Sequence, residues 1–152
     1  MAFPSAAQFD RHTAFLSDAE RVAAEAAAGN GIRVEQSVVT YYIARHAADS
    51  VLGVVYFDAH IVRTLDEVLM IVVGHDDTIA RIDILRFAEP PEYRAPDGWL
   101  ELLIGVPLSD ELSMKGDIPN MTGASLTARA VVQAGRRVLA LHQIIGPFDD
   151  ER

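Results

Sequence analysis

Apolar and polar residues alternate along the middle of the chain in the pattern of paired β-strands. β-Branched and aromatic residues dominate residues 38–43 and 51–57, and the polar turn 46–50 separates these two runs. Runs of this length and composition around a polar turn are typical of two antiparallel strands. The sequence therefore predicts a β-hairpin between residues 37 and 57.

A second hairpin is predicted directly after the first. Residues 67–74 and 78–87 are joined by the short polar connection 75–77, which is typical of antiparallel strands. Strict alternation in the last run puts Ile79 on the same face as Arg81. It also predicts that one face of the sheet is in contact with water.

Two longer segments carry the signals of α-helices. Ser17 and Glu20 form a capping box before an Ala-rich run, which predicts a helix over residues 18–28. Gly29-Asn30-Gly31 is expected to end it, because these residues accept left-handed backbone. Near the C-terminus, residues 126–142 predict an amphipathic helix. Its apolar face is expected to be formed by Leu126, Ala130, Ala134, Val138 and Leu141.

Prolines mark the connection between the second hairpin and the last helix. The run Ala88-Glu89-Pro90-Pro91-Glu92-Tyr93-Arg94-Ala95-Pro96 excludes a helix interior and a central strand, so it predicts an ordered loop. A short helix is expected over residues 99–104. A further connection over residues 105–121 then leads to the last helix.

These elements predict a single α+β domain over residues 1–152. The expected sheet is twisted and mainly antiparallel, with the helices packed on one of its faces. An N-terminal helical segment is assigned to about residues 1–31, and the core of the domain to about residues 37–145. A chain of 152 residues, half of them apolar, is large enough for one stable core.

The composition excludes several classes of function. The net charge of -9 and the isoelectric point near 4.9 argue against binding to nucleic acid or anionic lipid. The absence of cysteine excludes disulfides, thiolate metal sites, thiol catalysis and iron-sulfur clusters. No apolar run reaches the roughly 20 residues of a membrane span. The histidines lack metal-ligand spacing, and no Walker loop, dinucleotide fingerprint or nucleophile elbow is present.

The most informative residues directly precede the last helix, at Thr122-Gly123-Ala124-Ser125. A helix N-terminus presents unpaired backbone N–H groups and the positive end of the helix dipole, and small residues let a phosphate approach them. Thr-x-x-Ser is equally suitable for capping a helix that binds nothing. The residues alone therefore leave two interpretations open, a phosphate site and a plain helix cap.

Residues 121–128, Met-Thr-Gly-Ala-Ser-Leu-Thr-Ala, resemble the Ser/Thr-Gly-Ala-Thr/Ser-x-Thr-Ser/Ala signature of the FMN-binding domain family, which binds flavin mononucleotide (FMN). That family includes the flavin-carrying subunits of the sodium-pumping quinone reductase and its ferredoxin-linked relatives, and the sensor domain of nitrous-oxide regulators. The order of hairpin, Pro-rich loop and final helix also fits, so the resemblance covers residues 41–142. It implies an FMN phosphate site formed by Thr122, Gly123, Ala124, Ser125 and Thr127.

In that family, a flavin transferase links FMN through its phosphate to the last Thr or Ser of the Gly-Ala-Thr/Ser core. The resemblance points to Ser125 as the attachment residue. Pro119 stands where the family usually has Asp, and Ser is a less common acceptor than Thr. Both departures concern the covalent link rather than the phosphate site, so non-covalent binding of FMN is kept as an alternative.

The resemblance also implies residues beside the flavin ring. The segment Glu89-Pro90-Pro91-Glu92-Tyr93 resembles the family's Glu-Thr-Pro-Gly loop, with Glu89 as the matching acid. Tyr93 and Trp99 are candidates for stacking on the ring, because aromatic faces favour offset stacking. Ordinary packing of these two aromatic side chains is the alternative.

Three basic side chains are further candidates for contact with the flavin. His60 and Arg63 could donate to its carbonyl groups or phosphate, and such charge-assisted bonds would stabilise the anionic reduced form. Arg129, one turn into the last helix, could reach the phosphate. The alternative for all three is a solvated surface position.

The expected function is electron transfer by bound FMN, with the chain acting as an electron carrier rather than as an enzyme with its own substrate. The implied partners are a flavin transferase and redox proteins or a membrane cytochrome. The resemblance also implies an extracytoplasmic location, periplasmic or on the cell surface. The start Met1-Ala2-Phe3-Pro4 has no basic region followed by an apolar stretch, so no signal peptide is visible in it. A removed export signal and a cytoplasmic location both stay open.

Two other functions are kept as alternatives. One is a sensor or regulatory module that binds FMN without passing electrons along a chain. The other is a non-catalytic interaction domain in which residues 122–125 only cap a helix.

Overall fold

The computed structural model describes residues 6, 8–47, 50–114, 116, 118–121 and 123–149. Its regular elements, in chain order, are β1 (Gln8–Phe15), α1 (Asp18–Ala28), β2 (Val38–Arg45), β3 (Val51–Ile61), β4 (Asp66–Val73), β5 (Ile79–Phe87), η1 (Pro91–Tyr93), α2 (Asp97–Leu100), η2 (Glu101–Leu103) and α3 (Ser125–Ile145). The elements labelled η are single turns of 3-10 helix.

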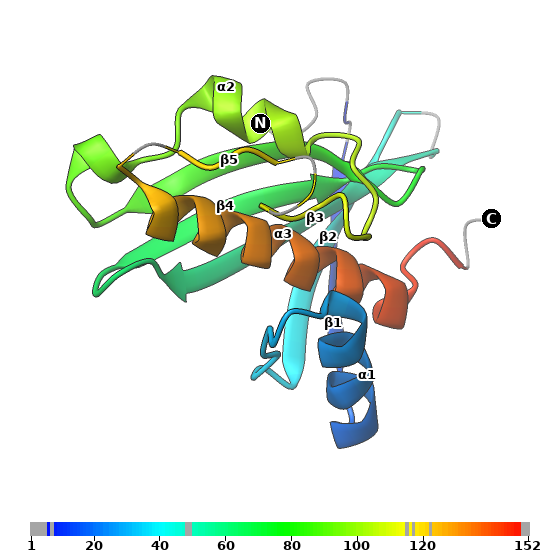
Figure 1. Ribbon diagram of the computed structural model, residues 1–152. Coiled ribbons are helices and arrows are strands. Elements are labelled where there is room, and N and C mark those ends of the chain that lie inside the picture. The colour runs from blue at the N-terminus through cyan, green and yellow to red at the C-terminus, as the bar shows by residue number, and fades with distance from the viewer. Residues whose placement is uncertain are drawn as a thin grey trace.

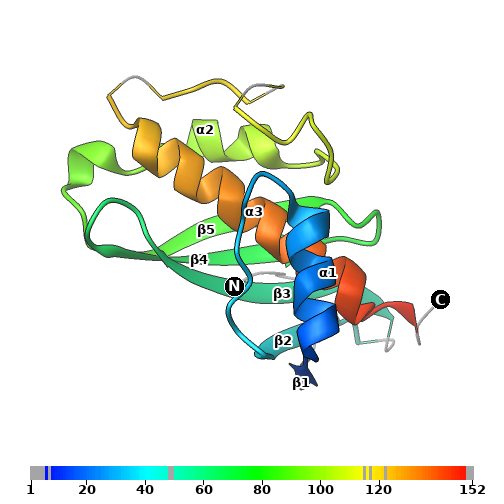
Figure 2. The ribbon, with the colours of Figure 1, turned by 60° about the horizontal axis from the view of Figure 1, so that its bottom comes forward.

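The five strands form one antiparallel sheet whose spatial order follows the sequence, β1-β2-β3-β4-β5. Figure 1 shows the strand direction turning strongly from β1 to β5, as expected for a twisted sheet. In Figure 2 the three α-helices lie on the same side of the sheet. The fold is therefore α+β, with three helices packing on an open antiparallel sheet.

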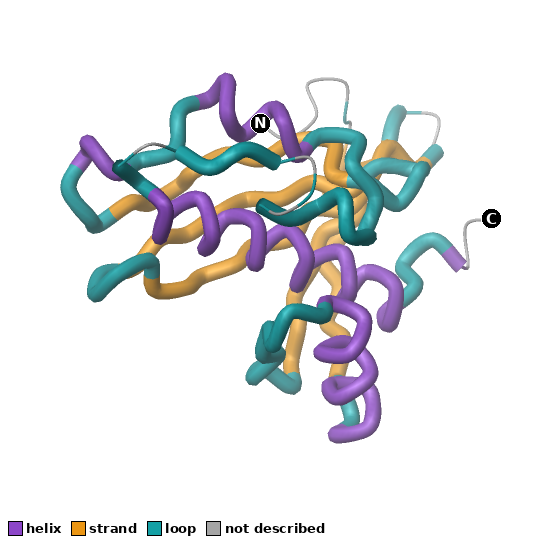
Figure 3. The backbone as a smooth tube through the Cα atoms, viewed as in Figure 1, coloured by secondary structure: helices purple, strands orange, loops and turns teal. Residues whose placement is uncertain are grey.

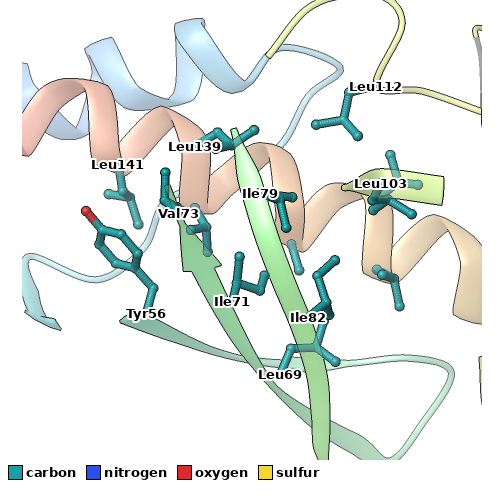
Figure 4. Close-up of a cluster of buried hydrophobic side chains, with 14 of the residues drawn as sticks. Tyr56, Leu69, Ile71, Val73, Ile79, Ile82, Leu103, Leu112, Leu139 and Leu141 are labelled. Carbon is teal, nitrogen blue, oxygen red and sulfur yellow. The ribbon is translucent and has the colours of Figure 1, made fainter. Parts of the chain in front are cut away.

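Helix α3 lies across the sheet and covers the hydrophobic core. Its side chains Val131, Val138 and Leu139 are almost completely buried and belong to the same cluster as the inner residues of β3, β4 and β5. Figure 4 shows this cluster, which includes Tyr56, Leu69, Ile71, Val73, Ile79, Ile82, Leu103, Leu112, Leu139 and Leu141. Burial of one such aliphatic side chain stabilises a fold by about 1.5–3 kcal/mol.

The loop between η2 and α3 runs beside α3 (Figure 3). The guanidinium of Arg136, on α3, fixes this arrangement by donating from one nitrogen to the carbonyl oxygens of Ser109 and Leu112, at 2.7 and 2.9 Å. Its Nε donates to the carbonyl of Ala28, at the end of α1, at 2.6 Å. One buried side chain thus ties α1 and the loop to α3.

Residues 8–15 form the edge strand β1, which the sequence analysis had placed in an N-terminal helical segment. The strand pairs with β2 over its whole length, from Gln8 opposite Arg45 to Phe15 opposite Val38. The prediction was therefore wrong for these residues, because pairing with a distant strand outweighs weak local preferences. Residues 1–5 and 7 of that segment lie outside the described residues.

The predicted helix over residues 18–28 is confirmed, as is its capping box. The Ser17 hydroxyl accepts from the Glu20 amide at 3.1 Å, and the Ser17 amide donates to the Glu20 carboxylate at 3.0 Å. Gly29, Asn30 and Gly31 all have positive φ, as expected for residues that end a helix.

The two predicted hairpins are confirmed as β2–β3 and β4–β5, with β3 extending to Ile61. The final helix is also confirmed. It spans Ser125 to Ile145, so it begins one residue earlier and ends three residues later than predicted. The short helix expected over residues 99–104 begins earlier, at Asp97, and continues as η2 to Leu103.

A bulge in the pairing of β4 with β5 overturns one prediction about the faces of the sheet. The register shifts between Val72 and Val73, so that Ile79 lies opposite Val73 and Ile82 opposite Ile71. Both isoleucines are buried, although strict alternation puts Ile79 on the face of Arg81. The extra residue changes the phase of the strand, which alternation alone does not reveal.

Substitution of Leu69 by Ala tests the packing of β4 under α3. Leu69 is fully buried in the core cluster, so Leu69→Ala should lower the free energy of unfolding by about 2–5 kcal/mol. Urea denaturation measures this change. Leu85→Ala is the control, because Leu85 is 54% exposed on the neighbouring strand and its truncation should cost far less. Equal losses in the two variants would contradict the assigned core.

Candidate functional site

A pocket of about 300 Å³ lies between the start of α3, the turn after β3 and the Pro-rich loop. Small-molecule sites usually have volumes of about 300–1,000 Å³, so the pocket can hold part of a cofactor-sized ligand. The described residues that line it are Val62, Arg63, Glu89, Tyr93, Gly123, Ala124, Ser125, Leu126 and Thr127. Seven of these nine are residues that the sequence analysis singled out, and they come from three segments distant in the chain.

The first turn of α3 meets the pocket without a side-chain cap. Its N-cap residue is Ala124, and its first turn contains no acidic residue. Among the described residues, no side chain accepts a hydrogen bond from the amides of Ser125, Leu126 or Thr127. These N–H groups, for which the described residues provide no side-chain acceptor, therefore lie at the pocket wall with the positive end of the helix dipole.

Small residues leave the approach to this turn open. Gly123 has a φ of +78°, a left-handed conformation that favours glycine, and a Cβ added there would meet no atom within 4 Å. The Ser125 side chain is exposed, and its hydroxyl oxygen accepts from the Asn120 amide nitrogen at 3.1 Å. Thr122, the first residue of the predicted phosphate site, lies outside the described residues.

Glu89 ties the Pro-rich loop to the turn between β3 and β4. A single carboxylate oxygen of Glu89 accepts from the amides of Arg63, Thr64 and Leu65, at 2.9, 2.8 and 3.1 Å. The hydrogen bonds from Thr64 and Leu65 are the main cause that holds the pKa of Glu89 below its ordinary value. The charge of Glu89 is thus bound by backbone donors, and the turn that carries Arg63 is held in place.

Arg63 and Tyr93 complete the pocket wall. Arg63 is exposed, and it is the one cation among the described residues that line the pocket. Tyr93 is half-buried at the end of η1. At the start of α3 the pocket therefore combines the cation of Arg63, the carboxylate of Glu89, which three backbone amides bind, and the aromatic ring of Tyr93.

His60 does not line the pocket, although it lies two residues before Val62. Its Nδ1 is 2.8 Å from Asp58 Oδ1, and its Nε2 is 2.7 Å from Glu67 Oε1. Burial lowers the pKa of His60, but the hydrogen bonds and charges of Asp58 and Glu67 outweigh burial and raise the pKa to about 9. Arg137 on α3 joins this group by donating from Nε to Asp58 Oδ2 at 3.2 Å.

Two further predicted site residues also lie away from the pocket. Trp99 is buried in the core cluster, and its ring nitrogen donates to the Pro119 carbonyl at 2.8 Å, which supports the segment before α3. Arg129 lines a different pocket, of about 490 Å³, together with Gln133 and Arg136 of the same helix.

Val62 and Leu126 line the pocket but were not among the predicted site residues. Leu126 is 44% exposed, so its assignment to the buried face of the last helix was wrong. The first turn of α3 extends beyond the core, and an apolar residue there faces the pocket instead. The sequence could have indicated Leu126, because it lies within the signature of residues 121–128. It could not have indicated Val62, which lies between the candidates His60 and Arg63 but has no polar side chain.

Comparisons with models of known protein families, with curated proteins and with solved structures found no match to this chain. Among the described residues, no helix is both long and apolar enough to cross a membrane. The same residues contain no group of three or more acidic, histidine or cysteine side chains placed to hold a metal ion.

Substitution of Glu89 tests its hold on the turn. Glu89→Ala should speed hydrogen exchange at the amides of Arg63, Thr64 and Leu65, because all three lose their acceptor. Exchange measured by NMR at single amides gives the result. Glu92→Ala is the control, since Glu92 is exposed in the same loop.

In the wild-type protein, hydrogen exchange at the amides of Arg63, Thr64 and Leu65 should become faster at low pH relative to other amides, as Glu89 is protonated. The folded pKa of Glu89 lies below the ordinary value of 4.5, so its stabilising effect is present above that value and is lost as the pH falls through the folded pKa. Unchanged protection of the three amides in Glu89→Ala would contradict the assignment.

His60 should stabilise the fold in a pH range that its raised pKa defines. The folded pKa of about 9 lies above the ordinary 6.5, so the contribution is complete below pH 6.5 and is lost as the pH rises through about 9. The difference in free energy of unfolding between wild type and His60→Gln should shrink over this range. Urea unfolding at several pH values measures it, and a constant difference would refute the role of Asp58 and Glu67.

Proposed function

We propose that this chain is an FMN-binding electron-transfer protein, with the flavin phosphate at the first turn of α3 and linked to the hydroxyl of Ser125. One observation carries the proposal. The pocket contains Ser125 and Glu89, which the sequence resemblance implied as parts of one flavin site, together with Arg63, which was an independent candidate for contact with the flavin. The eight-residue signature of residues 121–128 does not require Glu89 or Arg63 to lie beside it in the fold. That all of them line one pocket therefore supports the proposal.

The chemistry of the turn suits a phosphate. Its N–H groups, which no described side chain caps, can donate to phosphate oxygens, and the helix dipole favours an anion there by about 0.3–1 kcal/mol at an exposed site. Arg63 adds a positive charge at the pocket wall, and the three amides bound to Glu89 reduce the repulsion that its charge would exert.

The hydroxyl of Ser125 is the group available for a covalent link. It lies at the pocket, is exposed, and accepts a hydrogen bond from Asn120. In the link, the Ser125 oxygen would form a bond to the phosphorus of FMN as the phosphoanhydride bond of a flavin dinucleotide breaks, the serine proton passes to water, and a nucleoside monophosphate leaves. A flavin transferase would catalyse this step, and the chain would then carry FMN less one water.

Val62, Tyr93 and Leu126 form the apolar part of the wall, against which a flavin ring can pack. Bound FMN would accept and release electrons, while the chain binds it, orients it and excludes water from one side. The chain would then act as an electron carrier. Redox proteins or a membrane cytochrome are its proposed partners, and an extracytoplasmic compartment is the proposed location.

Flavinylation by a flavin transferase tests the proposal. Co-expression should raise the intact mass of the chain by one FMN less one water, and Ser125→Ala should abolish this gain. Ser125→Thr should keep it, because threonine offers the same hydroxyl and is the commoner acceptor in the family that the chain resembles. Ser37→Ala is the control, since Ser37 is exposed on another part of the fold.

The outcomes separate the alternatives. No gain of mass, together with removable yellow FMN after incubation, would replace the covalent link with non-covalent binding. A colourless protein that neither gains mass nor binds added FMN would contradict the flavin proposal and favour an interaction domain.

A further inference from the structure

Four charged side chains are buried together between the sheet and α3. They are Asp58 and His60 of β3, Glu67 of β4 and Arg137 of α3, with side-chain exposures of 4, 10, 0 and 14%. His60 bridges the two carboxylates, and Arg137 pairs with Asp58. With all four groups charged, the formal charges of this Asp58–Arg137 cluster sum to zero.

One atom of the cluster lacks a partner. Glu67 Oε1 lies 2.7 Å from His60 Nε2, but Glu67 Oε2 is fully buried and has no hydrogen-bond partner among the described residues. Both oxygens of Asp58 are used, by His60 and by Arg137. A bare carboxylate oxygen removed from water is costly, and a proton on it would remove the charge. Glu67 Oε2 is therefore the position at which the cluster can accept one more proton.

The cluster lies at the end of the β3–β4 hairpin, next to the turn that lines the pocket. In the sheet His60 lies opposite Glu67, and Val62, which lines the pocket, follows His60 by two residues. Two residues of chain span at most about 7 Å. A charge in the cluster can therefore act on a charge in the pocket, because buried charges are screened much less than exposed ones.

We propose that Glu67 takes up a proton at Oε2 when negative charge is added to the pocket, so that the Asp58–Arg137 cluster compensates the charge of a reduced flavin. This inference rests on the proposed function. Two-electron reduction of a flavin in mildly alkaline water brings one proton to the ring and leaves one added negative charge. The proposed redox partner supplies the two electrons. The compensating proton comes from a hydronium ion of the solvent, whose O–H bond breaks as a new O–H bond forms on Glu67.

The groups around Glu67 leave it as the member of the cluster that can accept the proton. His60 of β3 contacts Glu67 directly, whereas Asp58 contacts His60 and Arg137 of α3 contacts Asp58. On the other side, β5 places the uncharged Phe87 opposite Glu67. His60 and Arg137 already carry protons, and Asp58 has no free oxygen. Glu67 acts on the pocket through its charge, as a positioning residue rather than by contact.

Redox titration of the flavin-loaded chain tests the proposal. Two protons per two electrons shift the midpoint potential by about 59 mV per pH unit, and one proton by about 30 mV. The wild-type protein should show the larger slope and Glu67→Gln the smaller one. Glu92→Gln is the control, because it removes an exposed carboxylate from the Pro-rich loop and should keep the larger slope.

Infrared difference spectra identify the group that takes up the proton. Reduction of the wild type should produce the C=O band of a carboxylic acid, and Glu67→Gln should lack it. A wild-type slope of about 30 mV per pH unit, or no such band, would overturn the inference even if Glu67→Gln does not fold. If the chain binds FMN but fails these tests, the proposed function stands and only the inference about Glu67 is refuted. If the chain binds no FMN, both are refuted.

Discussion

The packing of α3 across β3, β4 and β5 is the constraint on which the rest of the structure depends. It buries the core, and the length of the helix carries its first turn past the core to the pocket. Gly135 allows close contact, since a Cβ there would lie 3.2 Å from the Ile79 side chain. Arg136 then fixes α1 and the preceding loop to the same helix through carbonyl groups. The position of Ser125 is thus determined by packing far from the pocket.

The opposite wall of the pocket is held by polar contacts instead. Glu89 binds three consecutive amides of the β3–β4 turn, so it ties the Pro-rich loop to the turn that carries Arg63. Prolines reduce the conformational entropy that such a loop loses on folding. Contacts that hold the two walls in place before a ligand binds are the preorganisation that a cofactor site requires.

The sequence was informative where local signals decide the structure. The capping box at Ser17, the glycines after α1 and the turns of both hairpins depend on neighbouring residues, and all were predicted. The sequence was less informative where contacts between distant segments determine the structure. Strand β1 exists because it pairs with β2, and the phase of Ile79 depends on a bulge opposite Val73. For the site, motif residues predicted much of the pocket wall. The engagement of His60 by Asp58 and Glu67 depends on strand register and could not be predicted from one strand.

The inner face of the sheet changes character along its length. On β3 it runs from Val54 and Tyr56 to Asp58 and His60, and on β4 from Val73 back to Glu67. Apolar residues at the charged end would pack against α3 with less desolvation, because buried ion pairs seldom stabilise a fold more than well-packed apolar side chains do. The charged end is the end next to the pocket. The buried charges on this face of the sheet, with one oxygen of Glu67 left without a hydrogen-bond partner among the described residues, are better explained by a role in the proposed site than by stability.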